Sequence, residues 1–332
     1  MLRSSVITAL VLAGLVICAV VNGGVVTNAV GLTGGLRWDA APRILAGNER
    51  SLDGGIRYSV SGGSYLALRD SFNWVSVPTE AQFKAVVEQS FAAWTGADPV
   101  SGTSSSLLFV SDFSTPIVAG GFGSIDFNGA EIDLVASDAG DAGLRGFTAL
   151  QPVPTEVTLT SGVANYANSQ AIGGVDLHLN NNAGAVYTLD IFQRLLTHEI
   201  GHAIGIGDVD LGGEFIDDDF DSADPEGTLT NSWIHLVDPL DPANSAGLSV
   251  YSVDPSYFMT SGVDLLMESN GLGIGPTNPL GTPVPLTNDE YGIRQFIYPS
   301  LTTVPEPSSS GLLVLVFVAG ALRRNRRLAT DA

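Results

Sequence analysis

The feature that most constrains this chain is the stretch THEIGHAIGIGD at residues 197–208, which follows an apolar segment. Residues four apart lie on one face of a helix, so His198 and His202 would present two imidazoles to one point. Glu199 lies about 100° around the helix axis and would flank a bound ion rather than bind it. This arrangement indicates a catalytic zinc site on a helix over residues 188–204. The alternative is a helix with two core histidines.

The third ligand of such a site is open to several interpretations. A catalytic zinc ion takes three protein ligands and keeps one position for water. Asp208 lies six residues after His202, and Gly205 between them gives the chain conformational freedom. Glu226 is a further candidate, but it lies between a proline and a glycine, which predict a turn. The spacing favours Asp208, and the alternative is a solvated Asp208 with Asp210 or Glu214 as the ligand.

The pattern His-Glu-x-x-His-x-x-Gly-x-x-Asp resembles the metzincin motif of zinc proteases, with aspartate in place of the usual third histidine. The resemblance implies that the helix ends at Gly205 and the chain turns back to offer Asp208 as the third ligand. It also implies that Glu199 is the general base and that a methionine lies in a tight turn beneath the metal. Met267 is the candidate for this Met-turn, and Met259 is the alternative. Packing in the core is the commonest role of a methionine and competes with both.

Among metzincins, the chain resembles the matrixins over residues 78–298. Ser90-Phe91-Ala92-Ala93-Trp94 is similar to the end of the first matrixin helix, and residues 174–180 are similar to the strand before the active-site helix. By analogy, residues 143–152 would hold an edge strand that pairs with an extended substrate. The resemblance implies an α+β fold with a twisted mixed sheet, an active-site helix, a Met-turn and a C-terminal helix.

The chain departs from the matrixin pattern in three places. The loop between Asp208 and Met267 is far longer. His178 fits one ligand position of a second, structural zinc, but Gly146 stands where another histidine is expected, so we interpret His178 as structural. A cysteine-switch propeptide is excluded, because the only cysteine, Cys18, lies in the apolar N-terminal run.

The pattern between these motifs predicts both helices and strands. A helix from Pro78 to Trp94, with Thr79 as its cap, carries an apolar stripe. A last helix over residues 287–298 begins with a capping box of Thr287 and Glu290. Short strands are predicted in residues 24–75 and at 106–110, 130–136, 146–150, 156–159 and 175–179. Strands before a central helix, followed by a loop and a terminal helix, indicate an α+β class.

The two ends of the chain predict export. Residues 1–23 have one basic residue, a long apolar run and small or polar residues at the end, which is typical of a secretory signal peptide. Residues 304–327 combine Pro-Glu-Pro, a short apolar run and four arginines, and resemble the PEP-CTERM sorting tail of Gram-negative bacteria. That resemblance implies transient inner-membrane contact, cleavage by an exosortase-type enzyme and delivery to the cell surface or extracellular matrix. Membrane anchors at either end are the alternatives.

The charge of the chain excludes one class of partner and indicates another. A formal net charge of −21 repels phosphate backbones, so no nucleic-acid partner is expected. Acidic residues are dense in the insertion at 209–262, where a cluster of five offers hard oxygen ligands for Ca²⁺. The spacing is not that of an EF-hand, and a solvated acidic turn is the favoured interpretation. The candidate calcium ligands are Asp217, Asp218, Asp219, Asp221 and Asp224.

These features predict a domain organisation and a function. A signal peptide (1–23) and a strand-rich segment (24–77) precede a metzincin-like catalytic domain (78–300), and the sorting signal (304–327) follows. The expected function is that of a secreted, zinc-dependent endopeptidase acting on a protein or peptide substrate. The alternative is a cell-surface or biofilm structural protein on the same scaffold, with little or no proteolysis. The intact Glu199 favours the enzyme, because a scaffold has no need of a general base.

Overall fold

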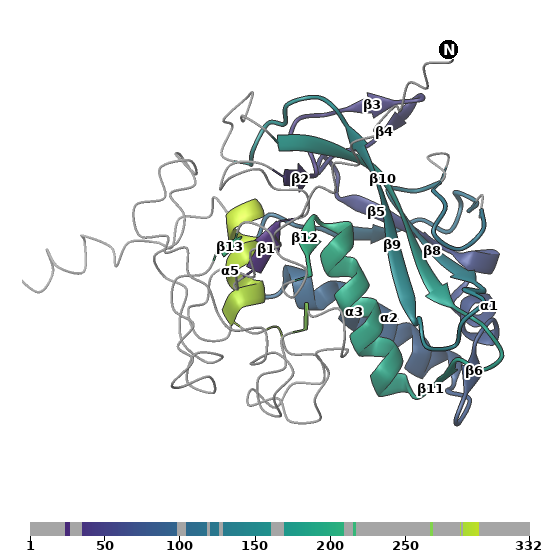
Figure 1. The fold of residues 1–332 in the computed structure, drawn as a ribbon. Helices are drawn as coiled ribbons and strands as arrows, with labels where there is room; N and C mark the ends of the chain where they lie inside the picture. Colours follow the sequence, from purple (N-terminus) through teal and green to yellow (C-terminus); the bar gives the residue numbers. More distant parts are fainter. Residues whose placement is uncertain are drawn as a thin grey trace, which may run out of the picture.

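A computed structural model describes residues 24–26, 35–97, 104–117, 120–125, 129–160, 169–208, 215–216, 266–267, 286 and 288–298. These residues form a mixed α and β structure with a mostly parallel main sheet (Figure 1). The predicted α+β class is confirmed at this level. The predicted signal peptide, the five candidate calcium ligands and the sorting tail lie outside the described residues. Within the described ranges, no helix has the length and apolar character needed to cross a membrane.

The main sheet has six strands, five of them in the order β2-β10-β8-β5-β7 with parallel neighbours. The sixth strand, β9, pairs antiparallel with β10. Strands from the segment before residue 78 therefore share one sheet with strands that follow it. The bounds are β2 (Gly35–Arg37), β5 (Ile56–Val60), β7 (Phe109–Ser111), β8 (Ile132–Ser137), β9 (Gly146–Val153) and β10 (Ser169–Asn180).

Smaller sheets surround the main one. In the first, β1 (Gly24–Val26) lies between β12 (Ile206–Gly207) and β13 (Phe215–Ile216), antiparallel to both. The other two are the β3–β4 hairpin and the parallel pair β6–β11. Their bounds are β3 (Ile44–Leu45), β4 (Asn48–Glu49), β6 (Asn73–Trp74) and β11 (Val186–Tyr187). The pairing of β1 with β12 ties the first described residues to the chain that leads to Asp208.

Two long helices pack against each other, and the second of them also packs against β9 and β10. In α2 (Glu80–Thr95), Thr79 and Gln82 form a capping box, and the predicted apolar stripe is buried. In α3 (Leu189–Ala203), the Thr188 side chain accepts a hydrogen bond from the Ile191 amide. Trp94 joins the two helices, because its indole donates to the Thr197 carbonyl at 2.8 Å. Figure 1 shows α3 running alongside β9, and the Thr148 hydroxyl of β9 contacts Glu199 of α3.

The short helical segment after β5 is a difference from the predicted strands. A 3-10 turn (Ser61–Gly63) and α1 (Tyr65–Asp70) connect β5 to β6. The Ser64 side chain caps α1 by accepting from the Ala67 amide, and Tyr65 and Leu68 are buried. A helical turn is favoured here because a serine cap precedes buried residues three apart.

The strand predicted at 156–159 is reduced to a single bridge at Val157. The Thr158 amide donates to the Asp39 carboxylate at 3.0 Å, and the Thr158 carbonyl accepts from the Ala40 amide at 2.9 Å. The polar groups of this backbone are thus satisfied by the segment after β2, and a regular ladder does not form.

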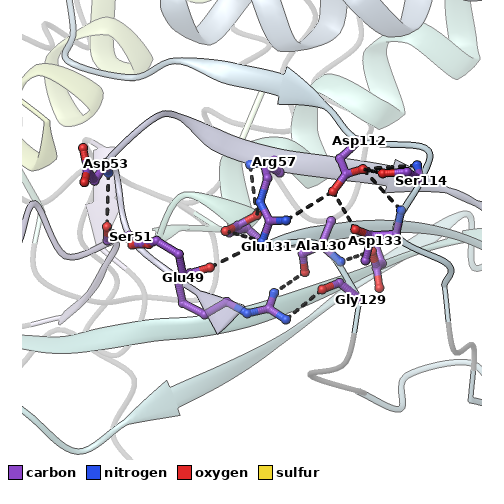
Figure 2. Close-up of polar contacts among 12 residues, drawn as sticks. Glu49, Ser51, Asp53, Arg57, Asp112, Ser114, Gly129, Ala130, Glu131 and Asp133 are labelled. Atoms are coloured by element: carbon purple, nitrogen blue, oxygen red, sulfur yellow. Dashed lines mark hydrogen bonds and ion pairs between the residues drawn. The ribbon is translucent and has the colours of Figure 1, made fainter. Parts of the chain in front are cut away.

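A buried group of charged residues fixes the start of β8 against β5 (Figure 2). The Arg57 guanidinium contacts both carboxylate oxygens of Glu131, at 2.9 and 3.0 Å, and Asp112 at 3.2 Å. The fully buried Arg50 donates to the carbonyls of Gly129 and Ala130. A buried charge is tolerated when it is paired and hydrogen-bonded, as the Glu131 carboxylate is by the partly exposed Arg57.

Candidate metal centre

The two histidines of the motif lie one turn apart on α3, with ring centroids separated by 4.6 Å. Their side chains are largely buried, with exposed fractions of 10% for His198 and 16% for His202. Gly201 allows this part of the helix to pack closely, because a Cβ at that position would lie 2.8 Å from the Trp94 ring and 2.9 Å from Met267 Cε. The helix therefore directs one imidazole pair toward a single region next to β12.

The orientation of both rings is set by backbone carbonyls. His198 Nδ1 lies 2.7 Å from the Leu266 carbonyl oxygen, and His202 Nδ1 lies 2.8 Å from that of Ile206. A carbonyl oxygen can only accept, so Nδ1 carries a proton and donates in each pair. This leaves Nε2 of the neutral ring with a lone pair, which is the arrangement that metal-binding histidines commonly have.

The end of α3 turns the chain back toward the histidines. Gly205 has a φ of +95°, and its amide donates to the His202 carbonyl at 2.9 Å. The Trp38 indole donates to the Ala203 carbonyl at 2.9 Å, and the Tyr298 hydroxyl donates to the Ile204 carbonyl at 2.7 Å. Carbonyls at a helix end lack partners within the helix, and here residues from distant segments supply them. The turn then enters β12, which leads directly to Asp208.

Asp208 completes a group of three converging side chains. Its Oδ1 lies 3.4 Å from His198 Nε2 and 3.2 Å from His202 Nε2. One ligand atom from each of the three residues lies within 4.8 Å of the others, so the group could hold a metal ion. Oδ1 is buried, and within the described part of the chain it has no hydrogen bond of normal geometry. A buried carboxylate oxygen in that state fits a cation as its missing partner.

The electrostatics of the group follow from its burial and its charge. Burial raises the pKa of Asp208, but the two imidazoles beside it outweigh this effect and lower the pKa below the usual value. Burial lowers the pKa of His202, but the adjacent Asp208 carboxylate outweighs it and raises the pKa to about 9. For His198, burial and the neighbouring His202 together lower the pKa. Without a metal, the group therefore favours a second proton on His202, at Nε2, which faces the Asp208 carboxylate.

Glu199 is buried beside this group but does not belong to it. Its carboxylate points toward β9, where Oε2 accepts a hydrogen bond from the Thr148 hydroxyl at 2.6 Å. It still interacts electrostatically with both histidines. The flanking position agrees with the expectation from helical geometry. The hydrogen bond between Thr148 and Glu199 could not be predicted from the sequence pattern, because the two residues are 51 positions apart on different elements.

Met267 lies directly beneath the histidine-bearing helix. It is 1% exposed and contacts Gly201 of α3. Its amide donates to Glu290 Oε1 at 3.1 Å, and the preceding Leu266 carbonyl accepts from His198. Glu290 belongs to α5 (Asn288–Ile297), where it was predicted to form a capping box with Thr287, which lies outside the described residues. The turn at Leu266 and Met267 is thus fixed to both helices.

Among the described residues, His178 is the remaining histidine candidate, and it does not join the group. His178 Nδ1 lies 2.9 Å from the Ser137 hydroxyl, and Nε2 lies 2.6 Å from the Ser124 carbonyl, so protein groups satisfy both nitrogens. Burial lowers the pKa of His178. These contacts support its interpretation as structural. Asp210, Glu214, Glu226 and Met259 lie outside the described residues.

Comparisons of the chain with protein-family models, with curated proteins and with solved structures find no match. The chemistry of the site therefore rests on its own residues. Two imidazole nitrogens and one carboxylate oxygen form a donor set that suits zinc and related transition metals.

Proposed function

We propose that this chain is a zinc-dependent metalloendopeptidase. The observation that supports this most directly is the convergence of His198 Nε2, His202 Nε2 and Asp208 Oδ1, with the buried Oδ1 lying 3.4 and 3.2 Å from the two nitrogens. These three atoms would hold the ion, which leaves a fourth position for water or substrate. A bound zinc ion supplies Lewis-acid polarisation of the scissile carbonyl and lowers the pKa of a water ligand to about 7.

Glu199 is the residue that moves the proton in this proposal. It follows His198 in the chain, and its carboxylate lies at the side of the group rather than within it. From there it can take a proton from the attacking water and then donate it to the leaving amine. The Leu266 and Ile206 carbonyls hold the two imidazoles in the tautomer that binds a metal.

The edge strand β9 offers a place for the substrate backbone. Among the described strands of the main sheet, β9 is paired only with β10, so its other side has no strand partner there. An extended peptide can add to such an edge by main-chain hydrogen bonds. Because Thr148 of this strand contacts Glu199, a peptide bound there would lie near the proposed general base. This position supports a protein or peptide substrate.

The proposal also takes up what the resemblances imply. Met267 would be the Met-turn residue of a matrixin-like metzincin, and its position under α3 supports that role. Residues 1–23 would be removed as a signal peptide. The tail at 304–327 would contact the inner membrane transiently before an exosortase-type enzyme delivers the protein to the cell surface or the extracellular space. Ca²⁺ would be a second ion, bound in the acidic insertion.

The test is digestion of casein or gelatin by the mature chain, residues 24–304. We expect activity that a chelator abolishes and that added zinc restores. Glu199→Gln should lose digestion and keep its zinc, because the glutamate does not bind the ion. An absence of digestion on any protein substrate, with one zinc bound per chain, would contradict the enzyme and leave a structural surface protein as the function.

A further inference from the structure

Two residues of β9 face the carboxylate of Glu199. Side chains two apart on a strand share one face, so Gly146 and Thr148 both point toward α3. The Thr148 hydroxyl lies 2.6 Å from Glu199 Oε2 and 3.1 Å from the Glu199 carbonyl oxygen. Both of these acceptors belong to Glu199, and the shorter contact is to the carboxylate. The hydroxyl thus joins the sheet edge to the proposed general base.

Gly146 provides the space that the Glu199 side chain occupies. A Cβ at position 146 would lie 2.9 Å from Glu199 Cδ and 3.0 Å from Cγ, and it would overlap Oε1. Such distances are too short for carbon atoms, so any larger residue would push the carboxylate away from β9. Gly146 has no positive φ, so the requirement is for space and not for an unusual backbone conformation.

The two contacts act on the two oxygens of one carboxylate. Thr148 holds Oε2 by a hydrogen bond, and Gly146 allows Oε1 to rest against the strand. A glutamate side chain that is free in solution has many rotamers, and ordering it costs conformational entropy. If the folded protein already fixes the side chain, the reaction does not have to meet this entropic cost. The same strand is the edge proposed for the substrate, so a peptide bound there would lie beside the held carboxylate.

We propose that Thr148 and Gly146 are positioning residues that aim Glu199 at the attacking water. This inference rests on the proposed function, because it assumes that Glu199 is the general base and says that two residues of the edge strand orient its carboxylate. Neither residue is a ligand of the candidate metal group, so their roles can be separated from zinc binding.

The experiment compares Thr148→Val, Thr148→Ser and Gly146→Ala in the mature chain, residues 24–304. We expect kcat to fall about 10–100-fold in Thr148→Val and Gly146→Ala, since a small misplacement of a reacting group costs up to about 100-fold. KM should stay within about twofold, and zinc content should be unchanged. Thr148→Ser should recover most of kcat, because it keeps the hydroxyl. Gly121→Ala is the matched control, since its Cβ would have no atom within 4 Å.

Crystal structures of Thr148→Val and Gly146→Ala supply a readout that does not depend on activity. We expect the Glu199 carboxylate to leave its position against β9 in both. A carboxylate that stays in place, a normal kcat in Thr148→Val, or a loss confined to KM would overturn the inference. If the wild-type protein digests nothing, the proposed function fails, and the crystal structures still decide whether these two residues hold Glu199.

Discussion

Replacement of Gly205 by alanine tests how the end of α3 brings Asp208 to the two histidines. Gly205 has a φ of +95°, a conformation that costs a residue with a Cβ about 1–2 kcal/mol. The added Cβ would also lie 3.1 Å from the carbonyl carbon of Leu36 and overlap its oxygen. Leu36 belongs to β2 in the main sheet, so its backbone cannot rotate away, and such overpacking costs about 1–3 kcal/mol. We expect the free energy of unfolding to fall by about 2–5 kcal/mol.

Gly47→Ala is the control that separates these two contributions. Gly47 has a φ of +86°, and a Cβ at that position would have no atom within 4 Å. It lies in the turn of the β3–β4 hairpin, and it does not belong to the candidate metal group. This variant should lose only the cost of the backbone conformation, about 1–2 kcal/mol. The difference between the losses of unfolding free energy in the two variants measures the cost of the steric overlap with Leu36.

The assays are urea unfolding in the presence of a chelator and zinc competition against a chromophoric chelator. We expect Gly205→Ala to lose at least about tenfold in zinc affinity, because Asp208 follows three residues later in the displaced chain. Gly47→Ala should bind zinc normally. If Gly205→Ala loses no more stability than Gly47→Ala and keeps full zinc affinity, the turn does not position the third ligand as we argue.

Three further predictions concern the site and its support. Asp208→Asn keeps the side-chain size but removes the charge, so zinc affinity should fall at least about 100-fold in the competition assay; undiminished affinity would place the third ligand elsewhere. The pKa of about 9 for His202 means that a metal ion must displace its proton at neutral pH. Apparent zinc affinity should therefore rise about tenfold per pH unit from pH 7 toward 9, and calorimetry in several buffers should show release of about one proton. Met267→Ala should cost about 2–5 kcal/mol in urea unfolding because it empties the space beneath Gly201, whereas Met267→Leu should cost less than about 1.5 kcal/mol.

Features set by local spacing were open to prediction from the sequence. The period of the helix is enough to put His198 and His202 on one face and Glu199 at their side. The same reasoning predicted α2, because Thr79 begins a stripe of buried apolar residues. The turn at Gly205 was expected from the resemblance to the metzincin motif, and the φ of +95° at that residue agrees with it. The strand predicted at 156–159 was wrong because its backbone pairs with Asp39 and Ala40 instead of a sheet neighbour.

The sequence by itself therefore determined which residues could form a zinc site and on which face of a helix they lie. Only the tertiary structure decided how that site is oriented and supported. The carbonyl that fixes His198 comes from Leu266, and the hydroxyl that holds Glu199 comes from Thr148. These partners are 68 and 51 residues away along the chain. The physical reason is that periodicity reports on neighbours along one helix or strand, whereas a hydrogen bond between two elements depends on how the whole sheet and its helices pack.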